Sequence, residues 1–305
     1  MVAALRLAVT GGTGFVGGRL LTLAEASPHS IKALTRRPQP PRDGVEWIEG
    51  ALDQREALHR LVHDADAVVH IAGIVNAPTA AGFEAGNVAG TLAVLAAATA
   101  AGVRRFVHVS SLAAREPELS IYGGSKAKGE RLVTGSGLDW AVVRPPAVYG
   151  PGDREMLELF KAASTGIMPL PPAGRLSLIH ADDLARLLLR LAEPRTPSRV
   201  TYEPDDDQPG GYSHKDFARM IGASADRRPF LFHVPAAVLR AAARIDRAVR
   251  RDRAKLTPDR AAYFCHPDWV SDPSRKPPPE LWQPEVPAPR GLAETAQWYR
   301  REGWL

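Results

Sequence analysis

A single cysteine, Cys265, occurs in the 305 residues of the chain, and this scarcity excludes a fold held together by intramolecular disulfide bonds. Chains with almost no cysteine are typical of reducing compartments, so we expect a cytoplasmic protein. No apolar run approaches the ~20 residues that a membrane-spanning helix needs. The first residues contain neither a basic stretch nor a small-residue cleavage site. We therefore expect no secretory signal and no stable membrane span.

Two further absences concern nucleic acids and metals. The chain has 39 Lys and Arg residues against 34 Asp and Glu, a net charge of +5, but no patch in which basic and aromatic residues interleave. Because such a patch is typical of nucleic-acid binding, we expect no nucleic-acid partner. His70, His108 and His180 lie in or beside expected strands without the spacing of metal ligands. We expect these histidines to be structural and no metal to be bound.

Arginine is concentrated in one expected helix, 237–253, where it is mixed with valine, leucine and isoleucine. A basic amphipathic helix can lie on an anionic membrane. It can equally cover a substrate cleft while its outer face stays in solvent. The pattern leaves both interpretations open, and we favour the second.

The first half of the chain alternates short apolar runs with helical patterns. The runs expected to form strands are Leu5–Thr10, Ile31–Leu34, Val45–Ile48, Ala67–Ile71, Phe106–Val109 and Trp140–Val143. The helical stretches between them lie at about 14–26, 54–62, 84–101 and 122–134. Nearly continuous apolar strands are buried on both faces, and regular alternation with helices predicts a doubly wound parallel sheet, an α/β fold of the Rossmann type.

The texture of the sequence changes after Gly150, where proline becomes frequent and the alternation is lost. The run Leu176–Ile179, followed by Asp182–Leu191, predicts one more strand and helix that return to the sheet. We therefore expect a dinucleotide-binding Rossmann domain (1–150 and 176–194), a smaller discontinuous substrate-binding lobe (151–175 and 195–290) and a C-terminal helix (291–305).

Glycines recur at three-residue intervals where the first strand passes into the first helix. Gly11 allows a sharp turn, Gly14 allows a close approach to a pyrophosphate, and Gly17 allows the helix to pack on the strand. The helix start then offers free N–H groups and the positive end of its dipole to an anion. The cofactor contacts expected in this turn are Gly11, Thr13, Gly14, Phe15, Val16 and Gly17.

The second strand ends in two arginines, Arg36 and Arg37, and no carboxylate follows it. An NAD site usually places an acidic residue here for the ribose hydroxyls, whereas a 2′-phosphate needs cations. Guanidinium groups bind phosphate oxygens in a bidentate way. The pair therefore favours NADP over NAD as the cofactor.

Several ordered motifs together resemble the extended branch of the short-chain dehydrogenase/reductases, the NAD-dependent epimerase/dehydratase family, and more specifically its dihydroflavonol-reductase and sterol-dehydrogenase-like members. The resemblance covers nearly the whole chain. Its motifs are the glycine turn, His70-Ile71-Ala72-Gly73, Asn87-Val88-Ala89-Gly90-Thr91, Val109-Ser110-Ser111, Tyr122-Gly123-Gly124-Ser125-Lys126, Arg144-Pro145-Pro146-Ala147-Val148-Tyr149-Gly150, His180-Ala181-Asp182-Asp183-Leu184-Ala185 and the segment Gly291 to Leu305.

The resemblance implies a catalytic triad of Ser111, Tyr122 and Lys126. It also implies further cofactor contacts, among them Ala72 and Gly73 along the adenosine and Asn87 as a brace between the ends of the fourth and fifth strands. The remaining contacts that it implies are Leu52, Tyr122 and Lys126, with Ser110, Pro145, Ala147 and Val148 on the nicotinamide side.

A phenol and an ammonium group four residues apart lie on the same face of a helix. At a separation of ~4 Å and an effective dielectric of about 20, their attraction is worth about 4 kcal/mol. This energy corresponds to a shift of up to ~3 pKa units, so we expect Lys126 to lower the pKa of Tyr122. Ser111 could hold a substrate oxygen beside the phenol, and Lys126 could also hold the nicotinamide ribose.

The chain departs from the family pattern at two informative positions. Ala51 stands where an aspartate often contacts the adenine, so adenine recognition must be weaker or come from elsewhere. Ala147 stands where nucleotide-sugar epimerases typically have an asparagine that touches the substrate. The second departure favours reductases over sugar epimerases.

Three functions follow from these patterns. The leading one is hydride transfer between NADP(H) and a small-molecule carbonyl or alcohol, with Tyr122 as acid and base. The second is a nucleotide-sugar epimerase or dehydratase that recycles a tightly held NAD, and the third is a non-catalytic dinucleotide-binding protein. The helices at 84–101 and 122–134 could pair with those of a second copy in a homodimer.

Overall fold

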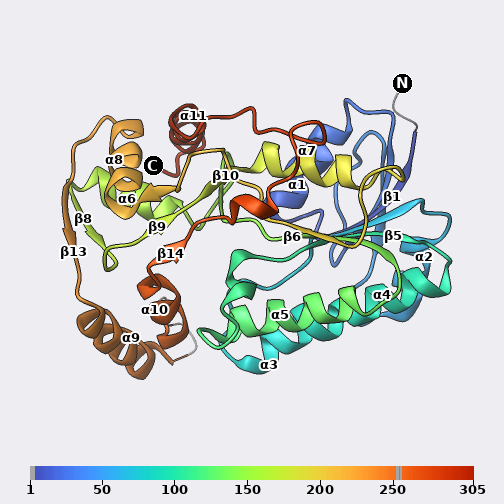
Figure 1. The fold of residues 1–305 in the computed structure, drawn as a ribbon, viewed down its shortest axis with the longest axis horizontal. Helices are drawn as coiled ribbons and strands as arrows, with labels where there is room; N and C mark the ends of the chain where they lie inside the picture. Colours follow the sequence, from blue (N-terminus) through green and yellow to red (C-terminus); the bar gives the residue numbers. More distant parts are fainter. Residues whose placement is uncertain (1–3, 252–253, 255) are drawn as a thin grey trace. The chain divides into compact units, whose positions relative to one another are not determined.

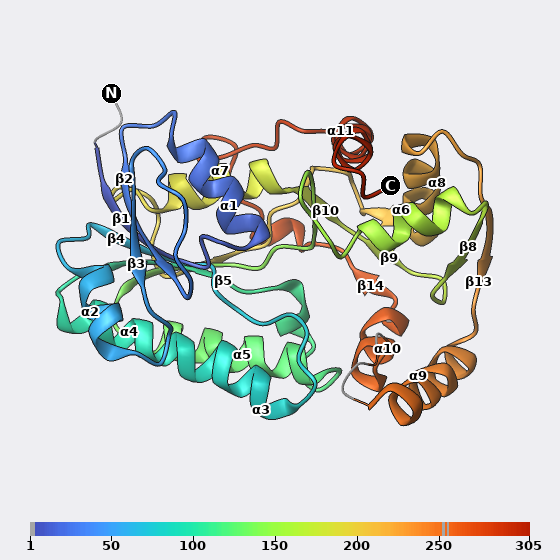
Figure 2. The same ribbon diagram turned by 180° about the vertical axis from the view of Figure 1, so that it is seen from behind.

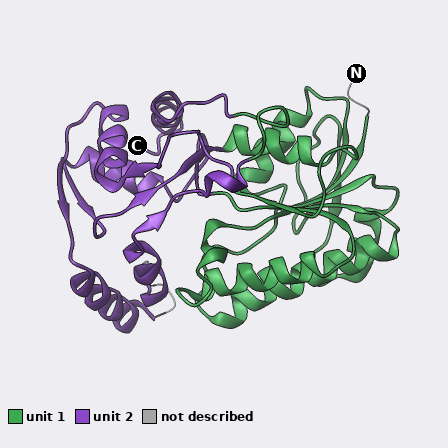
Figure 3. Cartoon of the chain, in the orientation of Figure 1, with its two compact units in different colours: residues 1–145, 181–203, 277–283 green, residues 146–180, 204–276, 284–305 purple. Residues whose placement is uncertain are grey.

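The computed structural model describes residues 4–251, 254 and 256–305, and the chain divides into two compact units (Figure 3). The first comprises Met1–Pro145, Ala181–Glu203 and Pro277–Gln283, and the second comprises Pro146–His180, Pro204–Lys276 and Pro284–Leu305. Compared with the expected domains, residues 146–150 and 176–180 lie in the second unit, and residues 195–203 and 277–283 lie in the first. The chain thus crosses between the units more often than the sequence predicts.

The first unit is built on a seven-stranded parallel sheet with the order β11-β6-β5-β4-β1-β2-β3. Its strands are β1 (Arg6–Thr10), β2 (Ser30–Thr35), β3 (Val45–Glu49), β4 (Ala67–His70), β5 (Arg105–Val109), β6 (Asp139–Val143) and β11 (Val200–Tyr202). Every residue of β4 and β5 is buried, as expected for central parallel strands covered on both faces. This confirms the doubly wound α/β fold, whose strand order reverses between β1 and β4, where ligands of such sheets bind.

Helices cover both faces of this sheet (Figures 1 and 2). On one face α1 (Phe15–Ala24) packs against α7 (Ala181–Leu191). The other face carries α2 (Arg55–Val62), α4 (Gly90–Ala100) and α5 (Ile121–Thr134). The shorter helices are α3 (Ala80–Phe83), the π-helix η1 (Glu84–Ala89) and the 3₁₀ turn η2 (Leu112–Arg115). Leu61, Val94 and Phe106 are fully buried in the core between the sheet and the layer formed by α2, α4 and α5.

The continuous helical run Ala80–Ala100 corrects the expectation that no apolar run approaches the length of a membrane-spanning helix. It is long and apolar enough to cross a membrane by length and composition alone, a test that core helices also pass. Val94, Leu95 and Ala98 of this run pack into the buried core of the first unit. The run therefore acts here as a layer of the α/β fold.

In the part of the second unit that the structure describes, three small sheets stand in place of one large one. Its strands are β7 (Ala147–Tyr149), β8 (Ile167–Leu170), β9 (Arg175–Leu176), β10 (Leu178–His180), β12 (Tyr212–Ser213), β13 (Phe230–His233) and β14 (Asp268–Trp269). Strand β10 pairs with β7, β8 pairs with β13, and β9 lies between β12 and β14. The expectation that the run at 176–179 returns to the main sheet is therefore wrong. Leu176 belongs to β9, Leu178 and Ile179 pair with β7, and the seventh strand of the main sheet is β11.

Helices α6, α8 and α11 enclose the core of the second unit. Its helices are α6 (Leu157–Ser164), α8 (His214–Ser224), α9 (Ala236–Arg250), α10 (Pro258–Cys265), α11 (Ala288–Arg301) and the 3₁₀ turn η4 (Pro273–Arg275). Phe160 and Tyr299 meet edge to face with ring centroids 5.2 Å apart, and Tyr299 Oη donates to the carbonyl oxygen of Asp153 at 2.6 Å. The C-terminal helix thus begins a few residues earlier than predicted and is anchored by an aromatic core.

Candidate active site

The glycine turn between β1 and α1 has a geometry that only glycine allows. Gly11 has a φ of +79°, and a Cβ there would lie 2.7 Å from the amide nitrogen of Ala72. A Cβ on Gly17 would lie 2.0 Å from the carbonyl oxygen of Gly11. Gly11 and Gly17 are therefore required by close backbone packing at the carboxyl edge of the sheet, whereas a Cβ on Gly14 would lie 3.3 Å from the carbonyl oxygen of Gly11.

The start of α1 is suited to an anion. Gly14 is its N-cap, and within residues 4–251 no side chain caps the helix and no acidic residue stands in its first turn. Thr13 and Gly14 are exposed. The N–H groups that begin the helix thus face solvent with a positive dipole, and the turn fits a pyrophosphate.

Arg36 and Arg37 follow β2 directly, and both are exposed. Thr35 fixes their backbone, because its hydroxyl donates to the carbonyl oxygen of Arg37 at 2.6 Å. Neither guanidinium has an ion-pair partner among the described residues. Two cations are therefore held at the end of the strand next to β1, free to bind an added anion.

Leu52, after β3, packs against the helix layer instead of standing free. A Cβ on Gly90 would lie 2.7 Å from Leu52 Cδ1. The side chain is half-buried, so it fills the gap between this loop and α4. Its expected cofactor contact stays a prediction.

Asn87 is a hydrogen-bonding brace, although its partners differ from the expected strand ends. Its Oδ1 accepts from the amide of Ile74 at 2.7 Å, and its Nδ2 donates to the carbonyl oxygen of Ile74 and to Ser125 Oγ, both at 2.9 Å. It therefore ties the loop after β4 to α5. Asn87 lies in the π-helical turns of η1, which are frequent at functional sites.

Lys126 is buried at the same place, with a side chain that points to the end of β5. Its Nζ donates to the carbonyl oxygen of Val109 at 2.8 Å. A Cβ on Gly73 would lie 3.3 Å from this Nζ and 3.1 Å from Asn87 Oδ1. Burial lowers the pKa of Lys126 to about 8, against the raising effect of the Glu130 charge. The structure thus brings Gly73, Asn87 and Lys126 together, as the sequence motifs suggested.

Tyr122 lies one helical turn before Lys126 and interacts with Ser111. Burial of the phenol raises the pKa of Tyr122, and the hydrogen bond with the Ser111 side chain opposes this rise. The expectation that Lys126 lowers the pKa of Tyr122 is therefore wrong for this structure. The reason is that the phenolate would lose its hydration, while the lysine donates to a backbone carbonyl. A phenol with a raised pKa is protonated at neutral pH and can act as a proton donor.

Ser110 adds a second hydroxyl at the end of β5. Its side chain is buried, and its Oγ has no hydrogen-bond partner among the described residues. Buried hydroxyl groups nearly always have a partner, so this one is suited to a bound ligand. Pro145 is held close to the end of β5, because its carbonyl oxygen accepts a hydrogen bond from the amide of Leu112 at 3.1 Å. Ala147 and Val148 belong to β7 of the second unit.

A buried ionic network supports the helix that carries Tyr122 and Lys126. Arg144 donates to both carboxylate oxygens of Glu130, at 2.8 and 2.6 Å, and to Glu203 at 3.2 Å. Arg115 donates to Glu203 at 3.3 Å. The sequence analysis missed this network. Glu130 could have been noticed, because it lies four residues after Lys126, but nothing local marks Glu203.

His70 links the glycine turn to Asn87 through two threonines. The hydroxyl of Thr91 donates to the carbonyl oxygen of Asn87 at 2.8 Å, so its oxygen accepts from His70 Nε2 at 3.0 Å. His70 Nδ1 then accepts from the hydroxyl of Thr10 at 2.7 Å. Burial lowers the pKa of His70 to about 3, which keeps the ring neutral. The histidine is structural, and the described residues contain no group of three or more side chains that could hold a metal ion.

Comparisons with known proteins agree with this geometry. A model of the NAD dependent epimerase/dehydratase family matches residues 7–202. A ceramide reductase from Caulobacter vibrioides is 37% identical over 98% of this chain and 96% of its own length. A 4-hydroxy-2-methyl-3-oxo-4-farnesyl-3,4-dihydroquinoline-1-oxide ketoreductase from Stigmatella aurantiaca is 31% identical over 81% of each chain. Among solved structures, gox2253 aligns with a TM-score of 0.78 at 22% identity and covers 99% of both chains, which supports the fold.

Proposed function

Since the chain belongs to the NAD-dependent epimerase/dehydratase family of extended short-chain dehydrogenase/reductases, and is an NAD(P)-dependent reductase, we propose that it reduces a lipid ketone with NADPH. The observation that carries the proposal is the meeting of Ser111, Tyr122 and Lys126 at the carboxyl end of β5. Ser111 hydrogen-bonds to the phenol, and Lys126 is held by the last carbonyl of the strand. This arrangement provides a proton donor and a buried cation within one helix turn.

The residues have separate roles in this reduction. The bound nicotinamide supplies the hydride that the carbonyl carbon receives. Ser111 donates a hydrogen bond to the carbonyl oxygen and orients it toward the phenol. Tyr122 gives its proton to that oxygen, so that the C=O group becomes CH–OH. Lys126, whose ammonium group is held at the end of β5, would bind the ribose of the cofactor.

Arg36 and Arg37 support NADPH as the cofactor. Both are exposed, unpaired among the described residues and held at the end of β2. The 2′-phosphate of NADPH is negatively charged and can bind these guanidinium groups in a bidentate way. The 2′-hydroxyl that NADH has at the same position is uncharged. We therefore assign the preference for NADPH to this pair.

The proposed substrate is the ketone form of a ceramide-type lipid. The support comes from the ceramide reductase, which this chain matches over nearly its full length, and from the ketoreductase that acts on a farnesylated ring. Ala147, at the position where sugar epimerases typically have asparagine, also favours a reductase. A lipid ketone needs one proton, which Tyr122 would give, and one hydride, which NADPH would give.

The test is a spectrophotometric assay with the ketone obtained by oxidising a secondary alcohol of a ceramide. We expect NADPH to be consumed in a one-to-one ratio with the ketone, and NADH to be used poorly. Purified protein that retains NAD through gel filtration and consumes no free NADPH with the ketone would instead support an epimerase or dehydratase. Protein that binds NADPH but reduces none of several lipid ketones would contradict the proposal.

A further inference from the structure

The positive charge of the chain is concentrated in the second unit. Residues 227–251 contain seven arginines and one aspartate, a net charge of +6 in 25 residues. The whole chain has 39 basic and 34 acidic residues, so the remainder has 32 basic and 33 acidic residues and a net charge of −1. The excess positive charge therefore comes from this one segment and not from the chain as a whole.

The same segment exposes large apolar side chains on α9. Val238, Ile245 and Val249 are 55%, 64% and 75% exposed. With Ala242, which is also exposed, they are spaced by four, three and four residues, so they form one stripe along the helix. Ala243 is the one residue of α9 that is fully buried, so the helix uses only a narrow face for packing within the unit.

The arginines of α9 lie on another side of the helix: at 100° per residue, Arg240 and Arg244 are about 170° and 130° around the axis from the middle of this stripe. Arg240 and Arg244 are exposed, and neither has an ion-pair partner in the described part of the chain. Asp246 is the one acidic residue of the helix, and it pairs with Arg250 at 3.3 Å. The helix therefore combines an exposed apolar stripe with a largely uncompensated positive charge.

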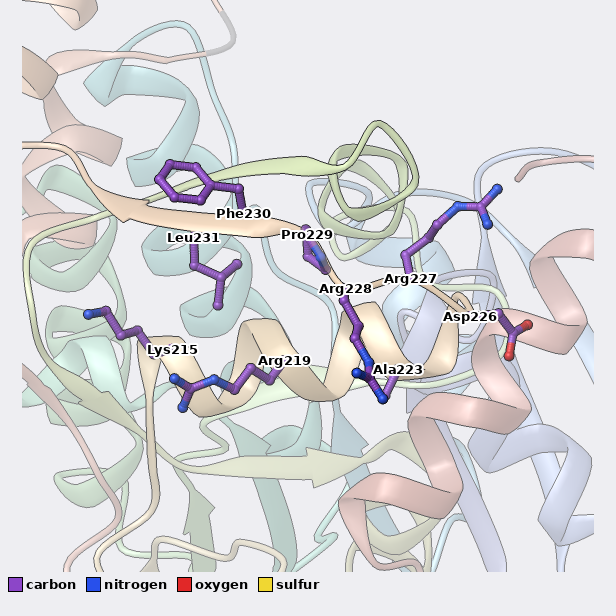
Figure 4. A pocket seen from close by; sticks show the side chains of 9 residues that line it. All are labelled: Lys215, Arg219, Ala223, Asp226, Arg227, Arg228, Pro229, Phe230 and Leu231. Atoms are coloured by element: carbon purple, nitrogen blue, oxygen red, sulfur yellow. The ribbon is translucent and has the colours of Figure 1, made fainter.

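Strand β13, which runs into α9 after only two residues, continues the pattern (Figure 1). Phe230 and Phe232 are exposed on one face of the strand with ring centroids 6.1 Å apart, and Ile167 lies opposite Phe230 on β8 and is exposed as well. Leu231 points the other way, toward α8 (Figure 4). The exposed apolar residues of β8, β13 and α9 thus come from adjoining elements of one unit.

Beside β13 lies a basic cavity of about 930 Å³ between the strand and α8 (Figure 4). Its charged lining residues are Lys215, Arg219, Asp226, Arg227 and Arg228. Arg219 and Asp226 are paired with residues outside the cavity, Asp216 and Arg300. No ion pair is recorded among the described residues for Lys215, Arg227 or Arg228, so the cavity has an unbalanced positive charge.

We infer that this surface, formed by α9, β13 and the cavity beside β13, binds the face of an anionic phospholipid membrane. An amphipathic helix with an apolar stripe on one side and arginines on its polar side lies in the plane of such an interface. Basic residues near an anionic surface each strengthen binding, and the apolar side chains enter the boundary of the acyl chains. The inference does not depend on the proposed reaction, because it uses no residue of the candidate active site.

The test is sedimentation of the full-length protein with vesicles. One set consists of phosphatidylcholine alone, and the other contains about one third phosphatidylglycerol. We expect binding to the anionic vesicles only, and we expect it to be lost at about 0.5 M salt because the charges are then screened. Equal binding to both sets, or to neither, would overturn the inference.

Two double variants separate charge from apolar contact. Arg240→Gln with Arg244→Gln should weaken binding to the anionic vesicles about 30-fold, as expected for two basic residues at such a surface. Ile245→Asp with Val249→Asp should abolish it at any salt concentration. As a matched control, Arg55→Gln with Arg131→Gln removes two exposed arginines of α2 and α5 and should change binding less than about twofold.

Two further measurements keep the outcome clear. Thermal unfolding and NADPH binding should be unchanged in all three double variants, which shows that they fold. If the wild type instead binds no vesicles but is a dimer by light scattering, and Ile245→Asp with Val249→Asp makes it monomeric, then a second copy covers the stripe and the inference is wrong.

Discussion

In the first unit, Glu203 has no solvent exposure and lies between Arg144 and Arg115, whereas in the second unit Arg240 and Arg244 project from α9 with no recorded ion-pair partner among the described residues. A buried charge must be paired, because removing it from water costs several kcal/mol. An exposed arginine needs no partner and remains available for association. The same residue type therefore supports the site in one unit and forms a surface in the other.

Apolar residues show the same contrast. In the first unit, β4 and β5 are entirely buried, and the motifs lie where these strands end. In the second unit, Phe230 and the stripe on α9 remain exposed. The comparison suggests that the first unit is specialised for chemistry and the second for contact with a lipid phase, and each experiment below tests one side of it.

The largest effect is expected for Tyr122→Phe in the first unit. Loss of the proton donor should lower kcat by about 1000-fold, within the range typical of general acids, and should leave the Kd for NADPH nearly unchanged. Tyr212→Phe provides the control in the second unit, where the hydroxyl of Tyr212 donates to Asp206 at 2.7 Å. Its kcat should change less than about threefold. A similar loss in both variants would mean that the assignment of chemistry to the first unit is incorrect.

Glu203→Gln should lower the free energy of unfolding by about 3 kcal/mol, because it leaves buried arginine charge partly uncompensated. Denaturant titration measures this change. In the second unit, Arg240→Gln removes an exposed charge and should stay within about 0.5 kcal/mol of the wild type. Equal effects would show that the network in the first unit is not coupled as its geometry indicates.

Arg36→Ala with Arg37→Ala should raise the Kd for NADPH about 100-fold, as expected when two hydrogen bonds to a charged phosphate are lost. The Kd for NADH should change little. The adjacent pair Arg227 and Arg228 of the second unit offers a matched variant, and its replacement by alanine should leave both cofactor affinities unchanged. Equal losses for NADPH and NADH would refute the preference for NADPH.

The smallest effect concerns pH. Because burial lowers the pKa of Lys126 to about 8, kcat should fall above this pH by about tenfold per unit as the ammonium loses its proton. Lys126→Arg should remove this decline, since guanidinium stays charged. If kcat of the Lys126→Arg variant still falls above pH 8, the group that titrates is not Lys126.

The same pKa shift predicts the pH dependence of stability. Between pH 8 and 10.5 the unfolded chain binds more protons than the folded protein, so this residue makes the free energy of unfolding rise over that interval. Lys126→Met should abolish this contribution, which denaturant titrations at the two ends of the interval would measure.

Much of the first unit could be predicted from the sequence, because its signals are local. The parallel strands are continuous apolar runs, and in the glycine turn Gly11 has a positive φ while Gly17 is required by its contact with the backbone of Gly11, six residues earlier. Tyr122 and Lys126 are neighbours through helical spacing alone. The partners of Asn87 could not be predicted, since they depend on how the loop after β4 meets α5.

The amino-acid sequence by itself determined the α/β fold, the glycine turn and the distribution of charge along the chain, because each depends on residues close in sequence. The tertiary structure decided that β10 leaves the main sheet, that burial raises the pKa of Tyr122, and that Glu203 joins Arg115 and Arg144. These features depend on desolvation and on contacts between distant segments, and neither is encoded in local patterns.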